Sequence, residues 1–176
     1  GLALQKYPAE DEAEYLPVVK IRELRQGNID SNSDKASTDI PDGYVVQDGD
    51  VLFSWSGSLL VDVWTGGKGG LNQHLFKVTS DHYPRWLYYF WTLTYLDSFI
   101  QIAADKATTM GHIKRHHLSE SLVVVPNDEV LPALTNQIEP YIEAIVNNRI
   151  ESRTLTETRD ALLPKLVSGE LRVGEM

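Results

Sequence analysis

The chain has 176 residues, of which 42% are hydrophobic and 23% are charged, and its formal net charge is −9. This length suits one globular domain with an appended helix, and the acidic balance argues against strong unspecific binding of DNA by the domain alone. Cysteine is absent, which excludes disulfides, thiolate metal sites and cysteine nucleophiles and fits a reducing cytoplasm.

Short strands are predicted through the first part of the chain. Residues 1–15 are acidic and lack the basic and then apolar segments of a secretory signal. Apolar runs bounded by turn residues predict strands at residues 15–21, 43–46, 50–55 and 74–78. Turns are expected in QGNIDSNSD, IPDG and TGGKGG, and a last strand is expected in SLVVVP, residues 121–126.

The most apolar stretch, residues 83–104, is long enough to cross a membrane, but Asp97, Gln101 and several threonines argue against a span. Its apolar side chains recur at helical spacing, and we expect a buried amphipathic helix with Pro84 at its first position. Stacking on nucleic-acid bases is the alternative for its aromatic side chains. The stripe expected in the core is Trp86, Phe90, Leu93, Ile100 and Ala103.

Beyond Pro126 the apolar residues recur in steps of three and four, which is typical of a long helix with a seven-residue repeat. Because proline disfavours a helix interior, we expect the uninterrupted helix to begin near Pro140, and to end before Ser168 and Gly169. Its apolar seam needs cover, either from a partner helix or from the chain's own domain. The seam contains Leu134, Ile138, Tyr141, Ile145, Leu155, Leu162 and Leu166, with the polar Asn148 and Ser152 in its middle.

These elements predict an α+β fold. A globular mixed-sheet domain is expected in residues 1–126, followed by a long C-terminal helix of coiled-coil type within residues 127–176.

Several enzyme motifs are missing from the sequence. TGGKGGLN has Gly69 after Lys68, where a phosphate-binding P-loop needs serine or threonine. FSWSGS does not match the G-x-S-x-G pattern, and neither a dinucleotide fingerprint nor H-E-x-x-H occurs. We therefore expect neither a nucleotide triphosphatase nor a hydrolase.

The sequence KATTMGHIKRHHL, residues 106–118, gathers basic side chains in an acidic chain. On one continuous helix, His112, His116 and Glu120 would share a face as zinc ligands, but Gly111 and the strand predicted at residues 121–126 leave little room for that helix, and we expect no metal. A solvated surface loop is the second interpretation. The third is DNA contact through phosphate-neutralising and hydrogen-bonding groups, namely Lys106, Thr108, Thr109, His112, Lys114 and Arg115.

A second candidate DNA-facing loop is GGKGGLNQH, which contains Lys68. Asn72 and Gln73 carry the amide groups that pair with adenine in the major groove, although they could equally satisfy backbone groups in a turn. Trp55, further back in the chain, is expected in the core.

Three segments resemble the specificity subunits of type I restriction-modification systems. ETRDALLPKLVSGELRV, residues 157–173, is similar to the closing segment of these subunits. GDVLFSWSGS, residues 49–58, resembles a pattern inside their target recognition domains, and we include Ser56 among the candidate DNA contacts. ATTMGHIKRHHLSESLVVVP, residues 107–126, is similar to the segment that leads into the strand closing that domain.

The resemblance implies a chain that recognises double-stranded DNA and catalyses nothing. Each target recognition domain of such a subunit reads half of a bipartite sequence, and the conserved helices dock methyltransferase subunits. One domain and one helix look like a C-terminal half or a half-subunit, which would pair through its helix with a second half-subunit or with its own copy. We expect no cofactor here, but S-adenosylmethionine in the methyltransferase subunit and ATP with Mg for the restriction (endonuclease/translocase) subunit.

Two other functions compete with this one. The first is an interaction module whose helix only scaffolds a partner, and the second is a zinc-dependent enzyme using His112, His116 and Glu120. The sequence has no cofactor loop and no Asn-Pro-Pro-aromatic or Asp-Pro-Pro-aromatic methylation motif, which agrees with a subunit that leaves methyl transfer to its partner. A cytoplasmic protein without membrane contact is expected.

Overall fold

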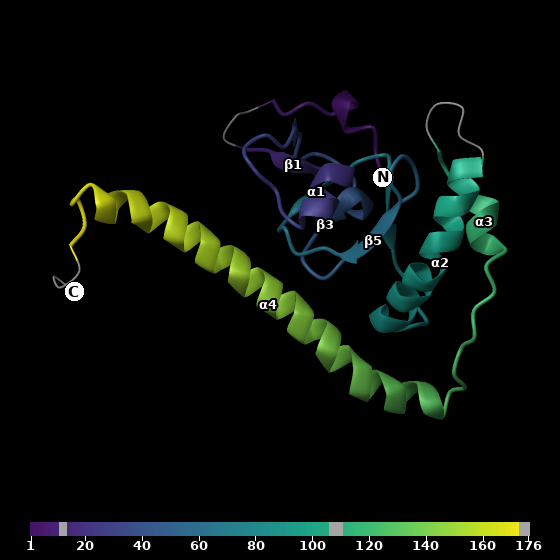
Figure 1. Cartoon of the computed structure of the whole chain (residues 1–176). Coiled ribbons are helices and arrows are strands. Elements are labelled where there is room, and N and C mark those ends of the chain that lie inside the picture. The colour runs from purple at the N-terminus through teal and green to yellow at the C-terminus, as the bar shows by residue number, and fades with distance from the viewer. Residues whose placement is uncertain (11–13, 106–110, 173–176) are drawn as a thin grey trace.

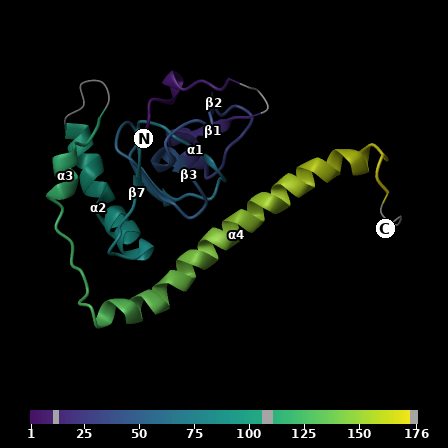
Figure 2. The same ribbon diagram turned by 180° about the vertical axis from the view of Figure 1, so that it is seen from behind.

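The computed structural model describes residues 1–10, 14–105 and 111–172. Two sheets pack against each other, a helical layer covers the second sheet, and a long C-terminal helix runs past the domain (Figure 1). Seen from behind, the second half of that helix projects clear of the domain (Figure 2). The predicted α+β fold is confirmed. Within the described ranges no helix combines the length and the apolar character needed to span a membrane.

The first sheet has the strand order β2-β1-β6-β3. Its central strands, β1 (Leu16–Val19) and β6 (Gly69–Leu71), are parallel, and both edge strands, β2 (Lys35–Ala36) and β3 (Val45–Val46), are antiparallel to their neighbours. Three short helices surround this sheet: the 3-10 helices η1 (Leu4–Lys6) and η2 (Asp42–Tyr44), and helix α1 (Ile21–Gln26), which follows β1.

Strand β6 corrects the prediction that all of TGGKGG is a turn. Gly69 and Gly70 lie in the strand, buried beside β1. A Cβ atom at Gly69 would lie 2.7 Å from Cγ2 of Val19 and 2.8 Å from the carbonyl oxygen of Pro17. Only glycine allows this close approach of the two strands, so the glycines serve the sheet rather than a loop.

The second sheet contains β5 (Leu60–Val63), β4 (Val51–Ser54) and β7 (Leu75–Val78), in that order and all antiparallel. Successive β4 side chains point to opposite faces, so Phe53 packs in the core shared with the helical layer and Leu52 packs against the first sheet with Trp64. Because β4 is covered on both faces, all four of its residues are buried. The four strands predicted before residue 80 are confirmed, whereas β2 and β5 were not predicted.

The strand predicted at residues 121–126 is wrong. This segment is irregular, and Leu122 and Val124 are 86% and 76% exposed. Two of its carbonyl groups accept side-chain hydrogen bonds from the neighbouring helix, at 3.1 Å from Nε1 of Trp91 and 2.5 Å from the hydroxyl of Tyr95. These bonds tie the segment to the helix instead of to a sheet.

Helix α2 (Arg85–Asp105) begins one residue after the position expected for Pro84. Of the predicted core stripe, Trp86 and Ala103 are buried. The prediction is wrong for Phe90, Leu93 and Ile100, which are 42%, 41% and 42% exposed. The buried face of α2 is completed by Leu87 and Phe99. Apolar residues occur on several faces of this helix, so its periodicity could not select the face that packs.

Two helices follow α2, the short α3 (Arg115–Ser119) and the long α4 (Val130–Val167). Helix α4 begins well before Pro140, and both Pro140 and Pro164 lie inside it. Asn127 accepts the backbone N–H of Val130 at 2.9 Å, and Nε1 of Trp86 donates to Oγ1 of Thr135 at 3.0 Å. Such contacts offset the roughly 3 kcal/mol that an internal proline costs.

The predicted end of α4 is confirmed. Ser168 caps the helix, and Gly169, with a φ of 75°, donates its N–H to the carbonyl of Leu166 at 3.2 Å. A positive φ is readily adopted by glycine, so the sequence Ser-Gly marks the helix end.

The first half of α4 packs on the chain's own domain. Ile142 and Val146 are 2% and 5% exposed, and they lie in the core cluster that α2 and the second sheet share. Ion pairs flank them, namely Arg85–Glu139 at 2.6 Å, Arg85–Glu143, Arg149–Asp62 at 2.9 Å and Arg153–Asp48 at 3.0 Å.

Arg85 stays charged in its ion pairs with Glu139 and Glu143. Partial burial alone would lower the pKa of Arg85, but the hydrogen bonds to Glu139 and Glu143 outweigh it and raise the pKa above its ordinary value. The guanidinium therefore stays charged wherever the two carboxylates are ionised.

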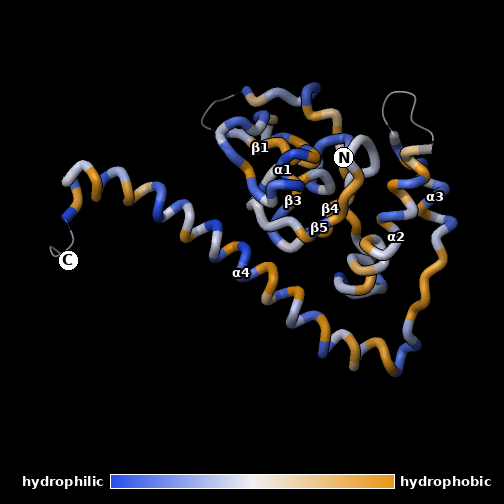
Figure 3. Tube along the Cα trace, in the orientation of Figure 1, coloured by the Kyte–Doolittle hydropathy of each residue, from blue (hydrophilic) through white to orange (hydrophobic). Residues whose placement is uncertain are grey.

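The predicted seam is divided between two environments. Leu134 and Ile138 are half-buried against the domain itself, which was the alternative partner for the helix. The other five seam residues are exposed, and apolar residues recur along the projecting half of α4 in Figure 3. They are Tyr141 at 73%, Ile145 at 44%, Leu155 at 62%, Leu162 at 40% and Leu166 at 37% exposed.

We expect Ile142→Ala to destabilise the chain by about 2–5 kcal/mol, because it empties space in a packed core. Asn147→Ala is the control, at an exposed position outside the seam and next to the buried Val146, and it should change stability by less than about 0.5 kcal/mol. Urea unfolding followed by tryptophan fluorescence measures both. Equal midpoints for the two variants would contradict the docking of α4.

Candidate nucleic-acid interface

The predicted DNA contacts do not form one group. Lys68 is exposed just before β6, whereas Asn72 and Gln73 follow this strand, so these residues lie at opposite ends of it. Arg115 is the first residue of α3. Lys106, Thr108 and Thr109 lie outside the described residues.

Pairing between distant segments brings several of the other candidates together. The N–H of Ile113 donates to the carbonyl of Trp55 at 3.1 Å, and the N–H of Gly57 donates to that of Gly111 at 2.9 Å. Between these bonds Ser56 and His112 form an antiparallel bridge. Residues 111–113 are thus fastened to the end of β4, and the ring of His112 lies edge-on to that of Trp55, with centroids 6.3 Å apart.

His74 connects the turn after β6 to the end of β4. Its Nδ1 is 2.8 Å from Oγ of the buried Ser56, and its ring centroid is 6.0 Å from that of Trp55. Nε1 of Trp55 donates to the carbonyl of Gln73 at 3.0 Å, and Nε2 of Gln73 is 3.4 Å from Nε2 of His74. We call Trp55, Ser56, Gln73, His74 and His112 the recognition cluster.

His74 was not predicted as a site residue, and Trp55 was expected in the core. Trp55 is half-buried, with one side stacked on Phe76 at 5.9 Å between centroids. Only one feature of the sequence could have indicated His74, namely that it directly follows the two amide residues in NQH.

Asn72 satisfies backbone groups in a turn, which was the alternative to a contact with adenine. It is 7% exposed, its Oδ1 accepts the backbone N–H of His74 at 3.2 Å, and its carbonyl accepts the N–H of Leu75 at 2.9 Å. Such a side-chain-closed turn is typical of asparagine. The contact to adenine stays a prediction for Gln73.

A cavity of about 450 Å³ adjoins the recognition cluster. Lys20 pairs there with Asp34, while the ammonium group of Lys35 lies 4.3 Å above the ring centroid of Tyr15 and has no carboxylate partner in the described ranges. Lys114 is also exposed and without an ion pair in those ranges, beyond His112. The cavity is lined by Leu4, Gln5, Pro8, Val18, Lys20, Asp34, Lys35, Asn72, Gln73 and His74.

The cavity shares Gln73 and His74 with the recognition cluster, and Lys114 follows His112 by two residues. We call the polar side chains of the cavity, the recognition cluster and Lys114 together the polar strip. Two of its lysines, Lys35 and Lys114, have no ion-pair partner among the described residues, in a chain whose net charge is −9. A strip of this kind can neutralise phosphates and offer hydrogen-bonding groups to base edges.

The geometry does not support the zinc interpretation. Among the described residues, His, Asp and Glu side chains form no group of three or more that could hold a metal ion. His112 is bridged to Ser56 and lies outside α3, whereas His116 lies within that helix, with its ring 4.0 Å from that of His117. The shared helical face that the spacing suggested does not form.

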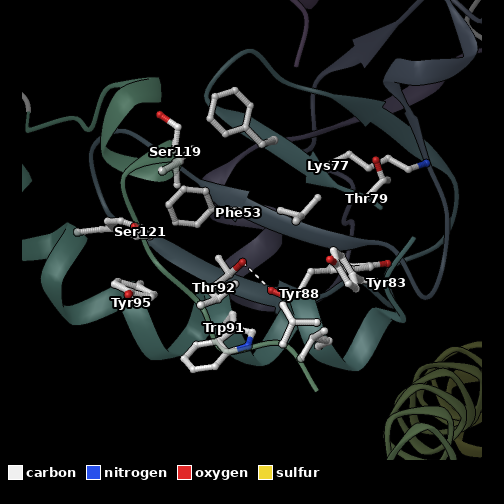
Figure 4. Close-up of a pocket in the computed structure, with 17 residues that line it drawn as sticks. Phe53, Lys77, Thr79, Tyr83, Tyr88, Trp91, Thr92, Tyr95, Ser119 and Ser121 are labelled. Atoms are coloured by element: carbon white, nitrogen blue, oxygen red, sulfur yellow. Dashed lines mark hydrogen bonds between the residues drawn. The ribbon is translucent and has the colours of Figure 1, made fainter. Parts of the chain in front are cut away.

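An apolar cleft lies elsewhere, between the second sheet, α2 and residues 118–125, with a volume of about 650 Å³ (Figure 4). Aromatic rings line it, and Oγ1 of Thr92 donates to the carbonyl of Tyr88 at 2.7 Å. Burial raises the pKa of Tyr88, so its phenol stays neutral. The side chains that line the cleft include no carboxylate and no histidine.

Comparisons with known proteins point to one class. No family model matches the chain. The MjaIX specificity subunit of Methanocaldococcus jannaschii is 38% identical over 71 residues, 40% of this chain and 16% of that protein. The EcoBI specificity subunit of Escherichia coli is 24% identical over 177 residues, 97% of this chain and 36% of that protein. The HindI specificity subunit of Haemophilus influenzae is 26% identical over 76 residues, 43% and 17% of the two chains.

A solved structure gives a weaker likeness. One chain from work on complex assembly and conformational transition of the type I R-M system has a TM-score of 0.40 and 19% identity, and the match covers 93% of this chain and 44% of that one.

These sequence relatives are specificity subunits of type I restriction enzymes, and the similarity of this chain to them confirms the resemblance predicted from its sequence. The chain spans 16%, 36% and 17% of the lengths of these three relatives.

Asn72→Ala should destabilise the chain by about 1–3 kcal/mol, because it leaves the backbone N–H of His74 without its acceptor. Lys68→Ala, at the exposed other end of β6, is the control and should stay within about 0.5 kcal/mol of the wild type. Chemical unfolding checks both variants. An Asn72→Ala protein as stable as Lys68→Ala would show that the side chain does not hold the turn.

Proposed function

We propose that the chain recognises one half of a bipartite DNA target, as part of the specificity subunit of a type I restriction-modification complex. The observation that carries this proposal is the alignment of 97% of the chain with the EcoBI specificity subunit. The polar strip supports it, since it combines uncompensated lysines with side chains able to contact base edges.

DNA contact would divide between two parts of the strip. Lys35 and Lys114 are exposed, and with Arg115 they would neutralise phosphates and set the register on the duplex. The recognition cluster, which is held by backbone pairing and by the Ser56–His74 contact, would face the bases. A rigidly held cluster favours discrimination, because misplaced groups would otherwise adapt to several sequences.

Catalysis belongs to other subunits in this proposal. The chain would bind no cofactor, while the methyltransferase subunit would hold S-adenosylmethionine and the restriction subunit would use ATP with Mg. A cytoplasmic complex on double-stranded DNA follows from this assignment, without membrane contact.

The exposed face of α4 would bind partner helices. Tyr141, Ile145, Leu155, Leu162 and Leu166 repeat with the spacing of a coiled-coil seam. In an antiparallel pair the apolar ends of two such helices would cover each other, with Asn148 and Ser152 near the centre. The second helix would belong to another half-subunit or to a copy of this chain.

The seam makes a direct prediction. Leu155→Asp with Leu162→Asp should abolish self-association or binding to the second half-subunit, because both side chains would leave the helix interface. Thr154→Asp with Ala161→Asp has the same spacing one position earlier and is the matched control. Sedimentation velocity measures the association, and a wild-type chain that is monomeric alone and with the partner half would refute the seam.

The proposed function itself is tested by DNA binding of the methyltransferase complex assembled with this chain. Lys114→Ala with Arg115→Ala should weaken cognate and non-cognate duplexes by similar factors and reduce the salt slope by about 1 for each lost contact. Sequence preference should persist, since phosphate contacts carry none.

Lys68→Ala is the control, because Lys68 lies at the other end of β6 from the recognition cluster. Complexes whose DNA affinity is the same with and without this chain would favour the scaffold function instead.

A further inference from the structure

We propose that Gln73 reads an adenine through its side-chain amide, and that His74, held by Ser56, is the positioning residue that sets the direction of that amide. The inference rests on the proposed function, which it deepens by naming a base and a second residue. It follows from the contacts of the two side chains in the free chain.

Gln73 has an unused acceptor. Its Oε1 is buried and finds no hydrogen-bond donor in the described part of the chain. An amide oxygen buried in this way destabilises the free state and gains when a donor is supplied. In the major groove such donors are the amino groups of adenine and cytosine.

The other end of the amide distinguishes between these bases. Nε2 of Gln73 has two hydrogens, and only one can point at His74 Nε2, 3.4 Å away. The second hydrogen is left for an acceptor next to the amino group. Adenine presents its N6 amino group beside N7, which matches an amide oxygen and an amide N–H together, whereas cytosine offers only its amino group there.

His74 sets the orientation of the amide. An amide NH₂ group only donates, so Nε2 of His74 has to accept, and the ring proton then lies on Nδ1, 2.8 Å from Oγ of Ser56. This tautomer turns Nε2 of Gln73 toward the ring and Oε1 away from it. The backbone of Gln73 is held separately, through the 3.0 Å bond from Trp55 to its carbonyl.

The free structure also has room for the movement that binding requires. Because Oε1 is buried, the Gln73 amide has to turn about its contact with His74 to meet a base, and it lines the cavity of about 450 Å³ beside η1 and β2. The positive charge of Lys35 at the same cavity suits an approaching phosphate backbone. Asn72, whose amide is occupied in the turn, is not part of this reading.

The test uses the assembled methyltransferase complex and duplexes carrying the target mapped from its own methylation. Each adenine of the half-site is replaced in turn by purine, which lacks the 6-amino group, or by 7-deazaadenine, which lacks N7. At one position the wild-type complex should lose about 5- to 150-fold in affinity with either analogue. Gln73→Ala, which removes both hydrogen bonds, should lose at least as much on the unmodified duplex and then ignore both analogues at that position.

His74→Ala should weaken the sensitivity to both analogues at the same position, while non-cognate affinity stays unchanged. The Gln73→Ala, His74→Ala double variant should discriminate no worse than Gln73→Ala, because the histidine acts through the glutamine. Gln47→Ala, an exposed glutamine outside the cluster, is the control and should behave as the wild type.

The outcomes separate the two levels of the proposal. If the wild-type complex responds to the analogues and Gln73→Ala responds in the same way at every position, the adenine contact is overturned. Loss in Gln73→Ala with full discrimination in His74→Ala overturns the positioning role. A complex whose sequence preference is the same with and without this chain overturns the proposed function, and this comparison uses unmutated protein.

Discussion

The burial of Ile142 and Val146 in the domain core is the constraint on which the rest of the arrangement depends. It joins α4 to α2 and to the second sheet in one packed unit, so the helix cannot swing independently of the domain. The flanking ion pairs extend this contact to Arg153. The projecting half of α4 then continues as a single helix from a fixed base, without a flexible linker.

Strand β4 connects the two functional ends of the domain. Asp48 and Gly49, just before β4, contact Arg153 of α4 and Arg85 of α2. Trp55 and Ser56, just after β4, belong to the recognition cluster. A fully buried strand therefore separates the proposed partner-binding helix from the proposed DNA-reading end, and it fixes the distance between them. This geometry suits a subunit that has to hold partner enzymes at a defined place relative to a sequence.

Helix α4 has one face that packs on the domain and another face that is exposed. The residues facing the domain are apolar at the centre and charged at the margin, which suits an intramolecular contact. The seam from Tyr141 to Leu166 lies on another face and stays exposed. The sequence pattern predicted one seam, because the two stripes overlap at Leu134 and Ile138, where only the tertiary contacts show which surface each residue faces.

The end of α4 was predictable, since it depends on the local pair Ser168 and Gly169, but its start depends on packing around Thr135. Likewise, β4 is evident as an apolar run, whereas β6 needs the approach of Val19 to explain its glycines. The recognition cluster could be predicted only in part, since Ser56, His74 and His112 come from three distant segments, and no local pattern shows that they meet.

The central claim, that this domain chooses the DNA sequence, is tested most directly by exchanging it. Methylated adenines would be mapped in DNA modified by the complex containing this chain, and again after residues 1–126 are replaced by the aligned segment of the EcoBI specificity subunit. The account predicts that one half of the methylated bipartite sequence changes while the other half and the dependence on the methyltransferase subunit stay the same. An unchanged methylated sequence after the exchange would contradict it.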